Sequence, residues 1–218
     1  MAALYPAATL AWFDRWDLPD GSRVTVRPVL PQDRGLERQF VAQALTARSR
    51  YQRFHTGLRE LPDTVAQYLT QVDQQQHVAL VVEHAGPQGP QQVADARFVR
   101  DPDLPQTSEF GLAVADAWQG LGLGRRLLRR LRDIATAQGL QVLYGDVLRD
   151  NQAMLGLARS EGFTRSRHQD DPRLVRLQLP LQTAPLPAWA AATALRIPHP
   201  AGGPDADPPR RQSPAACA

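Results

Sequence analysis

Three glycines spaced two residues apart, Gly120, Gly122 and Gly124, restrict the fold of this chain more than any other feature. They stand in the stretch AWQGLGLGRRLLRRLRDIA, between an apolar segment and a segment whose leucines have helical spacing. Glycine reaches backbone conformations that other residues avoid, and without a Cβ atom it lets another group come close. The sequence therefore predicts a strand, a turn and a helix, with the backbone N–H groups of residues 120–125 converging on a diphosphate at the positive end of the helix dipole.

Two common phosphate-binding motifs do not fit these glycines. A dinucleotide-binding fingerprint would need its third glycine at position 125, where the chain has Arg125, and an acidic residue about twenty positions later, for which Asp146 is only a loose match. A P-loop needs a lysine after its last glycine, and the chain contains no lysine. A turn that holds phosphate through backbone groups, with Arg125 and Arg126 adding charge beside it, is the interpretation that remains.

Composition and periodicity divide the chain into three parts. Residues 1–19 are expected to be irregular, residues 20–180 carry strong hydrophobic periodicity, and residues 181–218 form a tail rich in Pro and Ala that is expected to be disordered. A length of 218 residues with 43% hydrophobic residues suits one globular domain with such an extension.

Periodicity within residues 20–180 predicts both strands and helices. Alternating or continuous apolar runs predict strands, and apolar residues at helical spacing predict helices. The expected strands are 22–29, 77–84, 91–100, 108–115, 141–148, 163–167 and 174–179, and the expected helices are 31–45, 47–54, 63–72, 123–139 and 151–161. This order describes an α/β domain in which helices cover a mixed sheet.

Residue content argues against several other classes of protein. Cys217 is the single cysteine and the five histidines lack metal-site spacing, so no disulfide framework and no metal site is expected. A net charge of +3 does not indicate a nucleic-acid partner. No apolar run approaches the roughly 20 residues that cross a bilayer, and no leader pattern is present at the N-terminus, so the sequence predicts a soluble cytoplasmic protein without a membrane partner.

At the glycines the chain resembles a known family. Residues 119–124 match the Q/R-x-x-G-x-G/A signature of the GNAT superfamily of acyl-CoA-dependent N-acyltransferases, in the required place between a strand and a helix. The stretches SRYQRF, SEF and DNQAMLGLARSEGF make the chain similar, more narrowly, to the GNAT domain of bacterial protein lysine acetyltransferases, over about residues 5–179. The resemblance implies a GNAT fold, a mixed and mostly antiparallel sheet with a splayed central strand pair and flanking helices.

The resemblance also implies acetyl-CoA as cosubstrate and assigns residues to it. Backbone groups of the strand before the signature would contact the pantetheine arm, and backbone amides of the signature would hold the pyrophosphate. Asn151 would reach the pantetheine or the arriving amine, or it is only the N-cap of the next helix. The residues so assigned are Leu112, Ala113, Val114, Gln119, Gly120, Leu121, Gly122, Leu123, Gly124, Arg125 and Asn151.

Glu109 is the expected general base. It starts the strand that contacts the pantetheine, about ten residues before Gln119, where the similar lysine acetyltransferases have a catalytic glutamate. An amine with a pKa near 10.4 is almost wholly protonated at neutral pH, so a base is needed. A glutamate that only faces solvent at the strand edge is the alternative interpretation.

The position that holds a tyrosine acid in many GNAT enzymes is Ala158 here. The CoA thiolate would then leave unassisted, or another group such as Tyr144 would protonate it. Arg50, Tyr51 and Arg53 would shape the acceptor groove or hold the helical layer, and the acidic turn at 170–171 would suit a cationic acceptor or is ordinary turn chemistry.

The resemblance favours a protein lysine as the amine acceptor. A small-molecule amine is the alternative acceptor, and a CoA-sensing module without turnover is the alternative function. All 25 basic residues are arginine. Codon usage in a GC-rich genome explains this composition, and so does the benefit to a lysine-modifying enzyme of not modifying itself.

Overall fold

The computed structural model describes residues 7–87 and 89–181 of the chain. Of the segment expected to be a disordered tail, only Leu181 lies within the described residues. Within the described part of the chain, no helix combines the length and the hydrophobicity that a membrane crossing needs.

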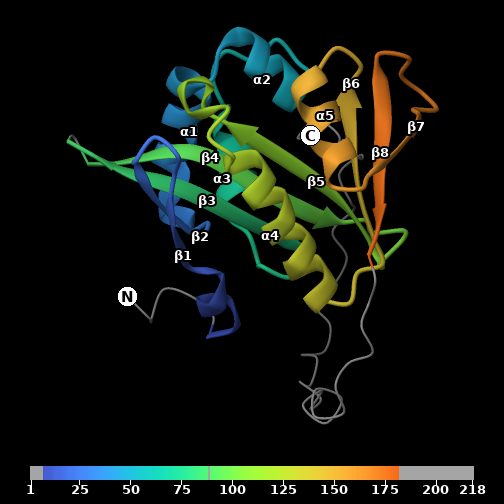
Figure 1. Cartoon of the computed structure of the whole chain (residues 1–218), viewed down its shortest axis with the longest axis horizontal. Helices are drawn as coiled ribbons and strands as arrows, with labels where there is room; N and C mark the ends of the chain where they lie inside the picture. Colours follow the sequence, from blue (N-terminus) through green and yellow to red (C-terminus); the bar gives the residue numbers. More distant parts are fainter. Residues whose placement is uncertain (1–6, 88, 182–218) are drawn as a thin grey trace, which may run out of the picture.

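One eight-stranded sheet forms the centre of the molecule (Figure 1). Its strands lie in the order β1-β2-β3-β4-β5-β6-β8-β7, and every neighbouring pair is antiparallel except β5 and β6, which run parallel. The strands are β1 (Asp14–Asp17), β2 (Arg23–Pro28), β3 (His77–Gly86), β4 (Gly89–Arg100), β5 (Thr107–Val114), β6 (Val142–Leu148), β7 (Thr164–Arg167) and β8 (Leu174–Pro180). The expected mixed, mostly antiparallel sheet of an α/β fold is confirmed.

Helices cover both faces of this sheet (Figure 1). They are α1 (Arg34–Gln39), α2 (Ala47–Phe54), α3 (Asp63–Thr70), α4 (Leu123–Ala137) and α5 (Gln152–Ser160), with the shorter turns η2 (Ala7–Trp12), η3 (Pro31–Asp33), η4 (Phe40–Ala44) and η5 (Asp116–Trp118). α4 buries a leucine face against the sheet, as its amphipathic pattern predicts.

The two larger of three hydrophobic clusters among the described residues lie on the two faces of the sheet. One contains the leucines of α4 together with Phe110, and the other contains residues of η4 and α3 together with Ala113. Successive side chains of a strand point to opposite faces. β5 therefore contributes Phe110 to the α4 core, whereas Glu109 and Ala113 face the side covered by α2 and α3.

Two local features differ from the sequence expectation. Residues 14–17, expected to be irregular, form β1, and only Trp16 of this strand is buried, so the alternation is too short to recognise. The helix expected at 31–45 is divided into η3, α1 and η4. η4 is a π-helical turn, whose i to i+5 spacing brings Phe40 and Leu45 into the same core.

β5 and β6 separate along most of their length (Figure 1). Their pairing ends at Glu109 and Tyr144. The ring of Phe110 lies where a side chain at position 145 would be, because a Cβ atom added to Gly145 would lie 2.7 Å from Cε1 of Phe110. The ring fills the space at the point where the strands part, and the splayed strand pair implied by the resemblance is present.

Candidate active site

The turn between β5 and α4 contains two glycines in the left-handed region. Gly120 has φ 79° and Gly122 has φ 87°, conformations that other residues rarely adopt. A Cβ atom added to either glycine would meet no atom within 4 Å. The backbone torsion therefore requires glycine here, and the space around both residues is open to a ligand.

Six consecutive backbone N–H groups of this turn, from Gly120 to Arg125, have no hydrogen-bond acceptor among the described residues. The neighbouring N–H groups are bonded, because Gln119 donates to the Asp116 carbonyl at 3.4 Å and Arg126 donates to the Gly122 carbonyl at 3.1 Å. α4 is 15 residues long, and its dipole adds positive potential at the same place. Unbonded N–H groups at a helix N-terminus are suited to binding an anion such as a phosphate.

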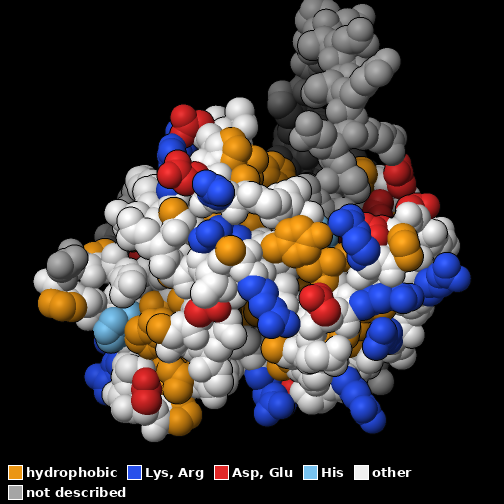
Figure 2. Space-filling view, turned by 90° about the horizontal axis from the view of Figure 1, so that it is seen from above, with side chains coloured by type: hydrophobic (Ala, Val, Ile, Leu, Met, Phe, Trp, Pro, Cys, Tyr) orange, Lys and Arg blue, Asp and Glu red, His pale blue; other side chains and the backbone are white. Residues whose placement is uncertain are grey.

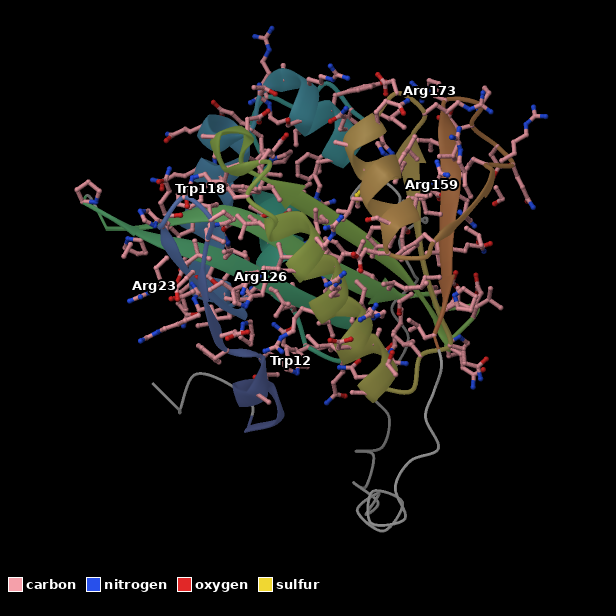
Figure 3. The ribbon with its side chains drawn as sticks, viewed as in Figure 1. Trp12, Arg23, Trp118, Arg126, Arg159 and Arg173 are labelled. Carbon is pink, nitrogen blue, oxygen red and sulfur yellow. The ribbon has the colours of Figure 1, made fainter. Side chains whose placement is uncertain are left out.

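The third glycine and the two arginines of the motif have different surroundings. A Cβ atom on Gly124 would lie 3.3 Å from a leucine methyl group of α5, so this glycine allows α4 to approach α5 closely. Arg126 lies on the side of α4 toward β1 (Figure 3), with its guanidinium 4.6 Å from the ring centroid of Trp16. Of the two arginines expected beside a bound phosphate, Arg125 lines the cavity described next and Arg126 does not.

The edge of β5 that faces the gap carries backbone groups that do not pair with a neighbouring strand beyond Glu109, although the Val114 carbonyl accepts a hydrogen bond from Nε2 of Gln119 at 3.2 Å. Ala115 donates its N–H to a β4 carbonyl at 2.8 Å. Residues of an antiparallel pair alternate in the direction of their hydrogen bonds. Ala113 therefore directs its backbone groups to β4, whereas Leu112 and Val114 direct theirs toward the gap between β5 and β6.

A cavity of about 490 Å3 passes through this gap. Its walls come from α2 on one face of the sheet, from β5 and the glycine turn, and from α5 on the other face. Among the residues expected to bind the cosubstrate, only Leu121 is not part of the wall, and those that line it are Leu112, Ala113, Val114, Gln119, Gly120, Gly122, Leu123, Gly124, Arg125 and Asn151.

Glu109 lies where β5 and β6 part, on the same face of β5 as Ala113. It is not one of the residues that line the cavity. The side chain is 8% exposed, and its Oε1 atom has no hydrogen-bond partner within residues 7–87 and 89–181. Burial and the nearby Asp146 carboxylate raise the pKa of Glu109 to about 7, although Arg176 and Arg53 act in the opposite direction. A carboxyl group in this state can take up a proton near neutral pH.

Charged groups of β6 and β8 surround Glu109. Arg176 donates to both carboxylate oxygens of Asp146, at 2.8 and 2.6 Å, and Nε2 of His168 lies 3.3 Å from the same carboxylate. The negative charge of Asp146 is therefore balanced by the guanidinium of Arg176. The Tyr144 hydroxyl donates to Asp101 at 3.3 Å, and burial raises the pKa of Tyr144 above its usual range.

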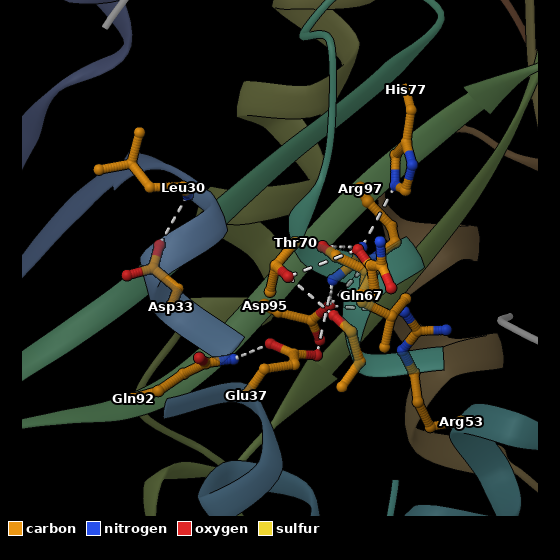
Figure 4. Close-up of polar contacts among 12 residues, drawn as sticks. Leu30, Asp33, Glu37, Arg53, Gln67, Thr70, His77, Gln92, Asp95 and Arg97 are labelled. Atoms are coloured by element: carbon orange, nitrogen blue, oxygen red, sulfur yellow. Dashed lines mark hydrogen bonds and ion pairs between the residues drawn. The ribbon is translucent and has the colours of Figure 1, made fainter. Parts of the chain in front are cut away.

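A buried network of ion pairs and hydrogen bonds joins α1 and α2 to β4 (Figure 4). Arg97 pairs with Asp95 at 2.9 Å, and Arg53 at the end of α2 reaches Asp95 at 3.4 Å. Gln92 donates to Glu37 of α1 at 2.6 Å. The network fixes α1 and α2 over β4, and Arg53 forms part of the cavity wall.

Asn151 both caps α5 and lines the cavity. Its side-chain oxygen accepts the N–H of Met154 at 3.1 Å, which is an N-cap bond. Both interpretations of this residue therefore remain compatible with its position. Ala158, seven residues later, is fully buried in the core on the α4 side.

Sequence reasoning missed part of the α2 wall. Ser49 and Gln52 line the cavity next to Arg53. Ser49, Gln52 and Arg53 are three and four residues apart, which places them on one side of a helix, and this spacing was the only signal in the sequence. Arg50 instead donates to the carbonyl groups of Leu45 and Leu58 and so holds the helical layer.

Acidic side chains do not gather into a metal centre here. Among the described residues, no group of three or more His, Cys, Asp or Glu side chains could hold a metal ion. In the turn between β7 and β8, Asp171 is paired with Arg173 at 2.7 Å.

Comparisons with known proteins give the family. Residues 45–163 match the acetyltransferase (GNAT) family. The chain is 32% identical over 170 residues to the acetyltransferase PA5475 of Pseudomonas aeruginosa, which covers 77% of this chain and 90% of that protein. It is 35% identical over 130 residues to the acetyltransferase Pat of Mycolicibacterium smegmatis, which covers 59% of this chain and 38% of that protein.

A solved structure agrees with these matches. The GNAT domain of PAT from S. lividans is similar to this fold with a TM-score of 0.72 and 26% sequence identity, over 81% of this chain and 99% of that domain. The family match spans more than half of the chain, and the relative from Pseudomonas aeruginosa is matched along most of its length. The chain belongs to the acetyltransferase (GNAT) family and is an acetyl-CoA-dependent acyltransferase.

Proposed function

We propose that the protein transfers the acetyl group of acetyl-CoA to a lysine side chain of another protein. The observation that carries this proposal is the buried Glu109 at the point where β5 and β6 separate, next to the cavity that runs from the glycine turn to α2. The amine attacks the thioester directly while both substrates are bound.

The cosubstrate fits the cavity through backbone groups. The free N–H groups of residues 120–125 would hold the pyrophosphate, and the gap-facing groups of Leu112 and Val114 would contact the pantetheine arm. One N–H on this edge of β5 would stabilise the thioester oxygen as negative charge develops on it. Figure 2 shows arginines gathered on the side of the molecule formed by α5 and β7, where Arg149, Arg159, Arg165 and Arg167 are exposed. Positive charge there favours the approach of an anionic cosubstrate.

Glu109 would act as the general base. Its carboxylate takes a proton from the acceptor ammonium, directly or through a water molecule, and the amine nitrogen then bonds to the acetyl carbon. The bond between that carbon and the CoA sulfur breaks, the sulfur leaves as a thiolate, and the nitrogen releases its second proton to water, which leaves a neutral amide. A pKa of about 7 suits this task, because a base works best when its pKa lies near the operating pH.

Two lines support lysine as the acceptor. The motifs SRYQRF, SEF and DNQAMLGLARSEGF resemble those of bacterial protein lysine acetyltransferases, and relatives named Pat and PAT are among the similar proteins.

Labelled acetyl-CoA, incubated with a cell lysate and the purified protein, tests the proposal. Discrete labelled proteins that disappear with Glu109→Gln, but not with Glu60→Gln, are expected. Glu60 is an exposed matched control. Label confined to small molecules would make the acceptor a metabolite, and acetyl-CoA binding without any transfer would favour a CoA-sensing module. The chain has no lysine, so labelling of its own side chains should not interfere.

A further inference from the structure

One carboxylate connects the glycine turn to the start of α2, although the two segments are about seventy residues apart in the sequence. Asp116 Oδ2 accepts the N–H of Thr46 at 2.8 Å. Its Oδ1 accepts the hydroxyl groups of Thr46 and Ser49 at 3.1 and 2.8 Å. Thr46 is itself the N-cap of α2, with its Oγ1 accepting the N–H of Ser49. Asp116 thus holds the first turn of α2 and also places a negative charge near the positive end of that helix.

The same residue belongs to the turn on the cosubstrate side. Asp116 begins η5, and its carbonyl accepts the N–H of Gln119 at 3.4 Å, directly before the six unbonded N–H groups. Because those groups have no acceptors among the described residues, hydrogen bonds within the turn do little to hold it when no ligand is bound. Backbone segments with few hydrogen bonds open readily.

α2 forms the other end of the cavity. Gln52 and Arg53 line it there, and the Tyr51 hydroxyl accepts a hydrogen bond from Arg173 of the turn between β7 and β8 at 3.2 Å. In the proposed reaction this end receives the acceptor amine. Asp116 lies next to the glycine turn and is hydrogen-bonded to the first turn of α2. A ligand that orders the glycine turn therefore also restrains the position of α2.

We propose that Asp116 couples the two substrates, so that acetyl-CoA bound at the glycine turn fixes α2 and prepares the acceptor end of the cavity. This inference rests on the proposed function for the identity of the bound ligand. Asp116 is a positioning residue, because it acts through α2 and not on the reacting atoms. Coupling between two binding sites is reciprocal, so acceptor binding tightens acetyl-CoA binding by the same factor.

Hydrogen exchange of the full chain with and without CoA tests the coupling without any acceptor. In the wild-type protein, CoA should slow amide exchange in residues 119–126 and also, by at least about fivefold, in residues 47–54. Asp116→Asn replaces one of the two acceptor oxygens with an NH2 group, so either the Thr46 N–H or the hydroxyl groups of Thr46 and Ser49 lose their acceptor, and this should abolish the effect on residues 47–54 while residues 119–126 stay protected. Asp133→Asn is the matched control, since Asp133 is exposed near the far end of α4.

The outcomes separate this inference from the proposed function. Absence of CoA binding to the wild-type protein would overturn both. CoA binding that leaves α2 exchange unchanged in the wild-type protein, or that slows it equally in Asp116→Asn, would overturn the coupling alone. If Asp116→Asn does not fold, Ser49→Ala removes one of the three bonds, and a response of α2 equal to that of the wild type would then count against the inference.

A kinetic measurement adds a second readout. With saturating acetyl-CoA, Asp116→Asn should raise the KM of the acceptor about fivefold or more and leave kcat within about a factor of two. A fall in kcat with an unchanged acceptor KM would instead indicate a role in the chemical step and would contradict a positioning role.

Discussion

Glutamine at position 109 should slow acetyl transfer strongly at neutral pH and much less at alkaline pH. Glu109→Gln keeps the size of the side chain and removes its ability to take up a proton. A lysine amine has a pKa of about 10.4, so only about one molecule in 2,500 is neutral at pH 7. The variant can use only that fraction, and the expected loss in kcat/KM at pH 7 is about 100-fold to 10,000-fold, the usual contribution of a general base.

The shape of the pH profile distinguishes a base from a structural glutamate. Burial raises the pKa of Glu109 to about 7, so wild-type kcat/KM should rise with pH up to that value and then level off. The profile of Glu109→Gln should lack this step and continue to rise about tenfold per pH unit toward the pKa of the amine. The two profiles should therefore converge at alkaline pH.

Initial rates between about pH 5.5 and 9.5, with the acceptor found in the lysate experiment, measure both profiles. Glu60→Gln should follow the wild type at every pH, because Glu60 is exposed and lies outside the cavity. A variant profile with the same midpoint as the wild type, merely lowered by a constant factor, would refute the assignment of Glu109 as the base.

Three further changes test the geometry. Because the pKa of Glu109 is about 7 in the folded protein and about 4.3 in the unfolded chain, the stability of the wild type relative to Glu109→Gln should fall between pH 4 and 7, and urea unfolding at pH 8 should show the variant more stable by up to about 4 kcal/mol. Gly122→Ala should cost about 1 kcal/mol in unfolding free energy, from the positive φ alone, and weaken CoA binding in calorimetry, whereas Gly35→Ala should leave CoA binding unchanged. Gly145→Ala should lower the unfolding free energy by about 1 to 3 kcal/mol, because its Cβ would meet the Phe110 ring, and an unchanged melting temperature would contradict that packing.

The order of the main elements could be predicted from the sequence because local patterns determine it. The leucine face of α4 and the apolar runs of β3 and β5 each signal one type of structure, and the structure contains them near the expected positions. β1 was missed because it buries a single side chain, Trp16. The break at η4 was missed because a π-helical turn has no distinct pattern in one sequence.

The site was predictable only where its residues are close in the sequence. The glycine turn is a local motif, so its open N–H groups followed from the spacing of three glycines. The wall formed by α2 and the bonds from Asp116 to Thr46 and Ser49 join segments about seventy residues apart, and no local pattern records such contacts. The resemblance to a known family supplied Glu109, and the structure adds its burial and its unpaired oxygen.

An alanine at position 158 is consistent with the energetics of the proposed reaction. Removing a proton from an amine with a pKa of about 10.4 at pH 7 costs about 4.6 kcal/mol, whereas leaving a thiol with a pKa of about 8.5 as its thiolate costs only about 2 kcal/mol. A base therefore lowers the barrier more than an acid does. Ala158 is fully buried and offers no proton, and the Tyr144 hydroxyl is bonded to Asp101 with its pKa raised by burial, so neither residue is suited to protonate the sulfur. With Glu109 meeting the larger requirement, the thiolate can leave unassisted and take its proton from water.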